Sequence, residues 1–382
     1  MRYRRLGKTG LMVSEVGFGG EWLERHDEEE SVELVRYAHG LGINIIDCWM
    51  PDPKSRDIIG RAIRDDRAGW IVQGHIGSTF QNGQYTRTRD VDRCREAFDD
   101  LLRRLQTDYI DLGMIHYVDL LDDWALVSNP GPYLDYVMGL KEKGVIRHIG
   151  LSTHNPEVAR LAAESGLIGM ILFSVNPAFD LMPPVDDLNR YFEGHYTEDM
   201  KGVDPVRAEM YRACEREDVG MTCMKPFAGG RLFDAHRSPF GVALTPLQCI
   251  HYCLTKPSVS SVLCGYDTKE QVDAAVAYET ATEDQKDYAT ILSHVSRHSF
   301  AGGECTYCGH CRPCPANIDI AMVNKFCDLA SMQETVPESI RQHYLALGHR
   351  ADECLKCGGC ERRCPFQVKV MEKMDRAARL FA

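Results

Sequence analysis

Eight short apolar segments, each followed by a stretch with helical periodicity, are the feature that most limits how this chain can fold. Amphipathic stretches such as VDRCREAFDDLLRRL, whose apolar residues recur at spacings of three and four, separate them. The eight segments are residues 15–19, 43–47, 70–74, 110–115, 148–151, 170–174, 219–224 and 259–264. Eight successive strand–helix units predict a closed parallel (β/α)8 barrel of the TIM type. An open doubly wound sheet is the alternative, but VGFGGEWL lacks the GxGxxG turn that normally follows its first strand.

Half of the 16 cysteines fall into two compact groups after residue 304, in CTYCGHCRPCP and CLKCGGCERRCP. The second group has the spacing C-x2-C-x2-C-x3-C-P of bacterial ferredoxins, and the first differs by one residue before its last cysteine. In that motif three thiolates hold one cluster and the fourth reaches the other. We therefore expect two [4Fe-4S] clusters, one on Cys305, Cys308, Cys311 and Cys364, and the other on Cys354, Cys357, Cys360 and Cys314.

Structural zinc is the alternative for these cysteines, because zinc bound by four cysteines also uses CxxC pairs. Zinc motifs are usually two separated pairs, whereas here four cysteines stand in one run closed by proline. The spacing therefore favours iron–sulfur clusters.

The chain divides into three predicted parts: the barrel over residues 1–281, a helical connector over 282–299, and a small α-helical ferredoxin-like domain over 300–382. The stretch 177–204 after the sixth strand is too long for a plain connection, so it is either a lid over the barrel mouth or a packing insertion.

Charge and hydropathy exclude several classes of function. A net charge of −12 argues against general binding of nucleic acid, which needs a basic surface. The first residues have no apolar targeting core, and no run of 18 apolar residues occurs, so we expect no membrane span and a cytoplasmic location. The expected ligand is a small molecule.

Six stretches, in chain order, resemble the aldo-keto reductases: YRRLGKTGLMVSEVGFGG, GINIIDCW, DYIDLGMIH, GVIRHIGLSTHNP, MKPFAGGRL and SVLCGYDTKEQV. The cysteine domain resembles the ferredoxin-like tail of one branch of that family. The resemblance implies transfer of a hydride between a nicotinamide cofactor and a carbonyl, assisted by a tetrad of Asp, Tyr, Lys and His at the barrel mouth.

The tetrad is altered in this chain. By resemblance Asp47 and His116 occupy the aspartate and histidine positions, whereas Asp52 stands at the tyrosine position and His75 at the lysine position. An unperturbed Asp loses its proton near pH 4 and a Tyr near pH 10, so Asp52 can act as an acid only if burial raises its pKa. We expect all four at the barrel mouth, with His116 steadying a substrate oxygen and Asp52 or His75 donating the proton.

The resemblance also places a nucleotide against residues that follow the fifth to eighth strands, namely Ser152, Asn176, Lys225, Gly229, Gly230 and Gly265. Asp267 replaces the arginine that often meets the 2′-phosphate of NADPH, and its charge would repel that phosphate. NADPH is therefore disfavoured, and NADH or another nucleotide is expected.

Electron counting leaves two alternatives open. A cluster moves one electron and a nicotinamide moves a pair, so exchange between them needs a flavin, a metal or a radical intermediate. The two Asp and two His of the altered tetrad either hold a mononuclear metal or form a hydrogen-bonded network around the substrate, which we favour. Otherwise the barrel is non-catalytic, and the chain is an electron-transfer or regulatory protein with a redox partner protein.

Overall fold

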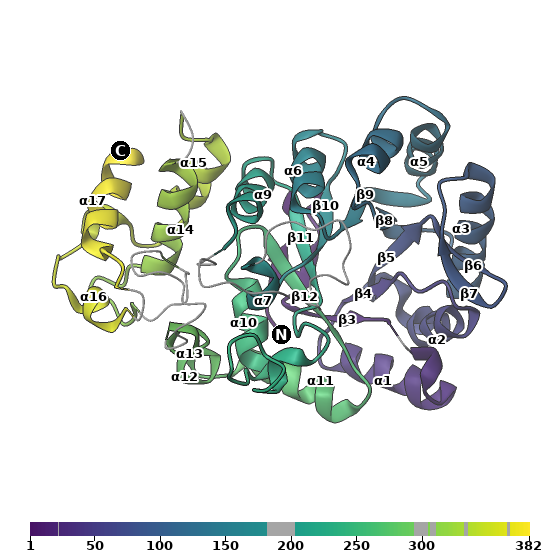
Figure 1. Ribbon diagram of the computed structural model, residues 1–382, viewed down its shortest axis with the longest axis horizontal. Helices are drawn as coiled ribbons and strands as arrows, with labels where there is room; N and C mark the ends of the chain where they lie inside the picture. The colour runs from purple at the N-terminus through teal and green to yellow at the C-terminus, as the bar shows by residue number, and fades with distance from the viewer. Residues whose placement is uncertain (22, 182–202, 294–304, 306–310, 332–334, 365–366) are drawn as a thin grey trace.

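The computed structural model contains a closed barrel of eight parallel strands, as the sequence predicts (Figure 1). It describes residues 1–382 except 22, 182–202, 294–304, 306–310, 332–334 and 365–366. The order around the barrel follows the chain, each strand pairing with the next and the last with the first. The strands are β3 (Val16–Gly19), β4 (Ile45–Cys48), β5 (Ile71–Ile76), β8 (Ile110–Ile115), β9 (Ile146–Thr153), β10 (Met170–Ser174), β11 (Gly220–Met224) and β12 (Val259–Gly265).

Helices surround the barrel (Figure 1). They are α1 (Glu28–Gly40), α2 (Pro53–Ile63), α3 (Val91–Leu105), α4 (Leu121–Ser128), α5 (Pro132–Glu142), α6 (Pro156–Glu164), α7 (Pro177–Asp180), α9 (Pro205–Arg216), α10 (Pro246–Leu254) and α11 (Lys269–Val276). Many start at a proline, whose fixed φ suits the first helical position, and follow a side chain that caps the free amide groups. Asn155 before α6 and Thr245 before α10 are examples. None of the described helices combines the length and apolarity needed to cross a membrane.

A hairpin of β1 (Tyr3–Arg5) and β2 (Met12–Ser14) precedes the first barrel strand and therefore lies at the N-terminal end of the barrel. Its buried Leu6 and Val13 join the apolar cluster inside the barrel, which also contains Ile45, Leu112, Met114, Met170, Leu172 and Leu263. Because side chains fill this end and the middle, the open space is left at the opposite end, where the active sites of such barrels lie.

A second hairpin, β6 (Ser78–Gln81) and β7 (Gln84–Arg87), follows β5 and so rises from the C-terminal end of the barrel. Gly77 has φ +92 where the chain leaves β5, and a Cβ there would lie 2.7 Å from the carbonyl oxygen of Thr88. Asn82 and Gly83 form the tip with φ +52 and +75, the conformation that an Asn-Gly hairpin turn requires.

The cysteine domain lies beside α9 and α10 (Figure 1). Its helices are α14 (Ile320–Ser331), α15 (Glu338–Leu345), α16 (Gly359–Arg363) and α17 (Val370–Leu380). Two short helices, α12 (Glu283–Lys286) and α13 (Ala289–Ser293), occupy the predicted connector. The predicted boundary at residue 300 and most of the predicted lid lie outside the described residues, so the domain limits and the lid stay predictions.

A buried charge joins the cysteine domain to the barrel. Glu215 of α9 is 8% exposed, and its carboxylate lies 3.5 Å from His343 Nδ1 of α15 and accepts from the amide of Ser258 at 3.0 Å. Burial alone would raise the pKa of Glu215, but Lys325 of α14 and His343 outweigh it and lower the pKa from 4.5 to about 2. The carboxylate therefore stabilises the docked arrangement as an anion.

We predict that Glu215→Gln lowers the free energy of unfolding by about 2 kcal/mol at pH 7, because the half-buried Lys325 loses its counter-charge and the amide of Ser258 loses a charged acceptor. Because the pKa of Glu215 is lower in the folded state than in the unfolded state, its carboxylate stabilises the fold fully above pH 4.5. This stabilisation is lost as the pH falls from 4.5 toward 2 and the carboxylate is protonated. Urea unfolding should show this difference and its decline below pH 4.5. The control Glu164→Gln, at a surface ion pair, should cost under about 1 kcal/mol; an equal loss in both variants would contradict the assignment.

Candidate functional site

A cavity of about 480 Å³ opens at the C-terminal end of the barrel strands. It is lined by residues of several strand ends and of the loops that follow them, the usual position of an active site in this architecture. The polar lining consists of Glu21, Asp47, His75, Tyr85, His116, Tyr117, Ser152, His154 and Lys225. Trp49, Leu172, Met224, Phe227 and Leu263 supply much of its apolar wall.

Three of the four predicted tetrad residues lie together in this cavity. Asp47 is in β4, His75 in β5, and His116 directly follows β8. His75 Nε2 lies 2.9 Å from Asp47 Oδ1, and His75 Nδ1 lies 2.8 Å from His116 Nδ1. The three side chains therefore form one hydrogen-bonded row from the barrel interior toward the cavity.

The partners of Asp47 fix the direction of these bonds. Its carboxylate accepts from Gln73 Nε2 at 2.8 Å, and Gln73 in turn accepts from Thr222. Since the carboxylate can only accept, His75 donates to it from Nε2, and in its neutral form it accepts at Nδ1. Neutral His116 then donates from Nδ1, which leaves its Nε2 as an acceptor. Burial first, and then the neighbouring His75, lower the pKa of His116 well below 6.5, which keeps this imidazole neutral.

Tyr85 completes the row, and the sequence interpretation missed it. Its hydroxyl lies 2.8 Å from His116 Nε2, and its ring packs edge-on against Trp49 with centroids 5.4 Å apart. Burial raises the pKa of Tyr85 to about 12, against an opposing effect of Arg87, so the phenol keeps its proton. The Asn-Gly sequence that ends two residues before Tyr85 predicts a hairpin turn after the third barrel strand. This signal could have placed Tyr85 at the C-terminal end of the barrel.

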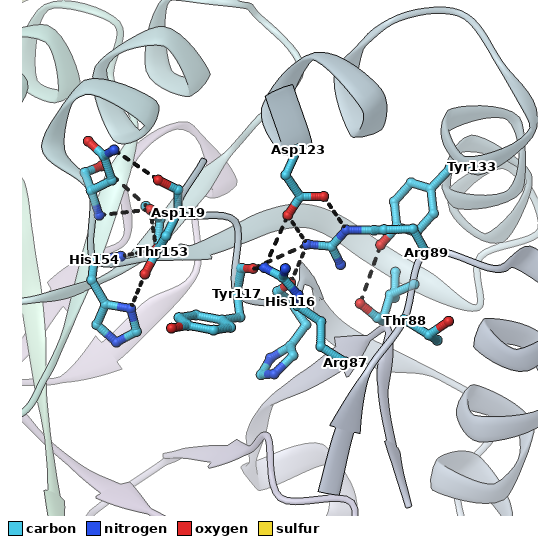
Figure 2. A network of polar contacts seen from close by, with 12 residues as sticks. Arg87, Thr88, Arg89, His116, Tyr117, Asp119, Asp123, Tyr133, Thr153 and His154 are labelled. Atoms are coloured by element: carbon cyan, nitrogen blue, oxygen red, sulfur yellow. Dashed lines mark hydrogen bonds and ion pairs between the residues drawn. The ribbon is translucent and has the colours of Figure 1, made fainter. Parts of the chain in front are cut away.

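Two arginines of the β7 strand and the following loop hold the backbone beside His116 (Figure 2). Arg87 Nη1 donates to the Tyr117 carbonyl at 2.7 Å, and Arg89 Nη2 donates to the His116 carbonyl at 2.8 Å. Both arginines also pair with Asp123. Tyr117 has φ +50, which is costly for a residue other than glycine, and the clamp stabilises this turn and so fixes the imidazole of His116.

His154 faces the same cavity as part of a second histidine–carboxylate pair (Figure 2). Its Nδ1 lies 2.9 Å from Asp119 Oδ2, and its backbone amide donates to Asp119 Oδ1 at 2.7 Å. Burial would raise the pKa of Asp119, but His154 and these hydrogen bonds lower it overall, so the carboxylate stays ionised. It holds the imidazole with Nδ1 protonated, which leaves Nε2 for a contact with a substrate hydroxyl.

Asp52 does not join this group, contrary to the expectation that all four residues meet at the mouth. Its carboxylate caps α2, accepting from the amide of Lys54 at 2.8 Å and from that of Ser55 at 3.4 Å, and it is not among the cavity residues. The physical reason is local, because Pro53 starts α2 directly after it and the free amide groups of that first turn need an acceptor.

The residues do not fit a mononuclear metal. Both ring nitrogens of His75 are used by Asp47 and His116, which leaves no lone pair for a cation. Within the described ranges, no three His, Cys, Asp or Glu side chains converge as a group that could hold a metal ion. In the described part of the chain, Asp47, His75 and His116 form a hydrogen-bonded network instead.

Most of the predicted nucleotide residues line the cavity, namely Ser152, Lys225, Gly229, Gly230 and Gly265. A Cβ at Gly230 or Gly265 would meet nothing within 4 Å, so open space adjoins the backbone there. Asn176 is not in the lining, because its side chain is engaged by the backbone. Its Nδ2 donates to the carbonyl of Lys225 at 2.9 Å, and its Oδ1 accepts from the backbone amide of Phe179 at 2.9 Å. Asp267 is exposed and lies 2.9 Å from His26 Nε2.

Five of the described cysteines, drawn from both groups, come together around a second, small pocket. They are Cys311, Cys314, Cys354, Cys357 and Cys360. The last four are the set expected for one cluster, drawn from both groups as in the ferredoxin pattern. Arg363 ties the groups together by donating to the carbonyls of Cys311 and Pro313, each at 2.7 Å.

Two cysteines expected for the other cluster already receive hydrogen bonds at sulfur. Asn324 Nδ2 donates to Cys305 at 3.3 Å, and the amide of Val368 donates to Cys364 at 3.5 Å. Such bonds stabilise thiolate ligands and tune cluster potentials. Cys308, the remaining member besides Cys311, lies outside the described residues.

Comparisons with known proteins assign both parts of the chain. A model described as aldo/keto reductase family matches residues 15–243, and one described as 4Fe-4S dicluster domain matches residues 304–369. L-galactose dehydrogenase of Arabidopsis thaliana is 28% identical over 313 residues, covering 73% of this chain and 88% of the relative. A probable voltage-gated potassium channel subunit beta of Oryza sativa subsp. japonica is 30% identical, covering 71% and 89%.

The fold has similar solved examples. An aldo-keto reductase of Bacillus halodurans in its holo form matches with a TM-score of 0.58 at 24% identity, covering 75% of this chain and 94% of that one. An aldo-keto reductase described as putative, from Pseudomonas aeruginosa, matches with a TM-score of 0.54 at 22% identity, covering 72% and 93%. At these identities the similarity shows that the barrel fold is shared.

We predict that Asp52→Ala lowers the free energy of unfolding by about 1 kcal/mol, because α2 loses its cap, whereas Asp52→Asn, which can also cap, leaves it nearly unchanged. Thermal or urea unfolding of the two variants measures this. If the Asn and Ala variants are destabilised equally, the carboxylate has another role.

We also predict that Cys305→Ala and Cys364→Ala remove the same cluster, although 59 residues separate them. Native mass spectrometry of protein purified without oxygen should find two [4Fe-4S] units in the wild type, one in each variant, and still one in the double variant, which would retain none if the two substitutions removed different clusters. The same spectrum reports retained nucleotide or flavin. Loss of different clusters, or a zinc mass in place of iron and sulfide, would contradict the assignment.

Proposed function

Because the chain belongs to the aldo/keto reductase family and carries a 4Fe-4S dicluster domain, we propose that it is an oxidoreductase that interconverts a carbonyl and a hydroxyl group of a small organic substrate in the barrel cavity. The observation that carries this proposal is the row of Asp47, His75 and His116, which runs from the barrel interior to the cavity wall. The name of one relative, L-galactose dehydrogenase, makes sugars a first substrate class to test.

In this proposal the substrate oxygen lies beside His116. The imidazole is neutral, buried and clamped through its backbone by Arg89, so it offers a fixed polar contact at low entropic cost. His75 also lines the cavity, but both its ring nitrogens are engaged, one by Asp47 and one by His116. A proton that moves along these hydrogen bonds between His75 and the substrate therefore passes His116.

A nicotinamide would be held between β9 and β12, where Ser152, Lys225 and Gly265 line the cavity. When bound, it supplies or accepts the hydride. The exposed carboxylate of Asp267 disfavours a 2′-phosphate, which supports NAD(H) over NADP(H).

The described cysteines of both groups, with Cys308, would hold two [4Fe-4S] clusters, each able to transfer one electron when bound. Cys357 is exposed, so a redox partner protein can approach its cluster directly. Because a cluster moves electrons singly, exchange with a nicotinamide calls for a flavin, a metal or a radical intermediate.

We expect His116→Ala to reduce kcat by about 100-fold or more, because the row loses its contact with the substrate. The assay follows NADH formation or consumption with panels of sugars, secondary alcohols, aldehydes and ketones, using holoenzyme purified without oxygen. Since the pKa of His116 lies well below 6.5, the wild-type rate should show no loss attributable to this residue as the pH falls through 6.5.

Asp52→Asn is the matched control, since Asp52 lies outside the cavity and Asn keeps the cap. It should retain the wild-type rate, and cluster content should be unchanged in both variants. A wild type without turnover of any panel member, but with reducible clusters, would overturn the proposal in favour of an electron-transfer or regulatory protein.

A further inference from the structure

We propose that Tyr85 is the catalytic residue that exchanges a proton with the substrate oxygen, and that His116 and His75 relay this proton toward Asp47. The inference rests on the proposed function. It names the side chain that gives a proton to the substrate oxygen in reduction and takes that proton in oxidation. The loop between β4 and α2, where the resemblance predicts a tyrosine, carries Asp52 instead, and that side chain is a helix cap. The required phenol comes from the β6–β7 hairpin.

Three contacts fix Tyr85 in place. Its hydroxyl lies 2.8 Å from His116 Nε2, and its ring packs against Trp49. The base of the hairpin is tied to the same loop, because Ser78 Oγ donates to the Trp49 carbonyl at 2.6 Å. Tyr85 also lines the cavity, so one face of the phenol is available to a substrate. The hydroxyl therefore lies between the substrate space and the histidines.

With His75 and His116 both neutral, the hydrogen bonds of the row all run in one direction. Asp47 then accepts from His75 Nε2, His75 Nδ1 accepts from His116 Nδ1, and His116 Nε2 accepts from the hydroxyl of Tyr85. Each member therefore has a proton to pass toward Asp47 and a lone pair to receive the next one. A row with this polarity takes up a proton at its Tyr85 end.

This polarity supports oxidation of a hydroxyl group. The substrate C–H bond breaks and its electron pair leaves as hydride to NAD⁺, while the carbon–oxygen bond becomes a carbonyl. The hydroxyl proton passes to the oxygen of Tyr85, whose own proton moves to His116 Nε2. The Nδ1 proton of His116 moves to His75, whose imidazolium then lies beside the carboxylate of Asp47. Reduction is the exact reverse and starts with that proton stored on His75.

The location of the final charge favours this relay. Asp47 lies 2.9 Å from His75, so the imidazolium forms next to a buried carboxylate that also keeps a hydrogen bond from Gln73. A charge left on His116 would instead face Arg87 and Arg89, which already disfavour its protonated form. The relay moves the charge away from the two arginines and toward the one carboxylate of the row.

The test is Tyr85→Phe in the holoenzyme, assayed with NAD⁺ and the sugar or secondary alcohol that the wild type oxidises fastest. The expected result is a kcat lower by about 100- to 1,000-fold, with KM little changed because the ring remains. The residual rate of the variant should rise with pH more steeply than the wild-type rate, because hydroxide must then take the substrate proton. A purely structural role would not produce this change in the pH profile.

Tyr37→Phe is the matched control, since its hydroxyl bonds Asp273 at 2.7 Å on the surface and lies away from the cavity. It should keep the wild-type kcat. An active wild type with an equally active Tyr85→Phe variant would overturn this inference alone. A wild type that oxidises and reduces nothing in the panels would overturn the proposed function, and this inference with it.

Discussion

The hydrogen bond between Asp47 and His75 is the interaction on which the rest of the site depends. It joins two neighbouring barrel strands inside a low-dielectric interior, where an unpaired carboxylate would be costly. When His75 is neutral, the bond fixes its tautomer. That tautomer fixes the tautomer of His116, whose Nε2 then accepts from Tyr85. A lysine at position 75 would pair with Asp47 but could not continue this row, because an ammonium group has no acceptor. We therefore infer that two features accompany each other: the replacement of lysine by His75 and of tyrosine by Asp52, and the β6–β7 hairpin that brings Tyr85 to His116.

The barrel and the cysteine pattern could be read from the sequence because both depend on local periodicity. Each of the eight predicted strands overlaps an observed one, and five of the cysteines expected to hold clusters line one pocket. From the sequence we placed Asp52 at the barrel mouth because it stands at the tyrosine position of the tetrad. The structure shows that its side chain caps α2 instead. Tyr85 was missed because its contact with His116 joins two segments 31 residues apart.

The cysteine domain is docked rather than tethered. The buried Glu215 of the barrel lies 3.5 Å from His343 of the cysteine domain, and the positive charge of Lys325 in that domain helps to lower the pKa of Glu215. Arg363 in turn spans the two cysteine groups through the carbonyls of Cys311 and Pro313. Cluster binding, the fold of the small domain and its attachment to the barrel are therefore linked, since each relies on contacts that the others hold in place.

The protonation states of His75 and His116 are the most direct measure of this account, and they need no substrate. Nitrogen-15 NMR of protein labelled at histidine distinguishes the two neutral tautomers from the imidazolium. At pH 7 we predict a neutral His116 with its proton on Nδ1 and its Nε2 as an acceptor. In Tyr85→Phe the Nε2 signal should shift, because Nε2 loses the hydrogen bond from the phenol. A His116 that is protonated on both nitrogens, or that keeps the same Nε2 signal without the phenol, would contradict it.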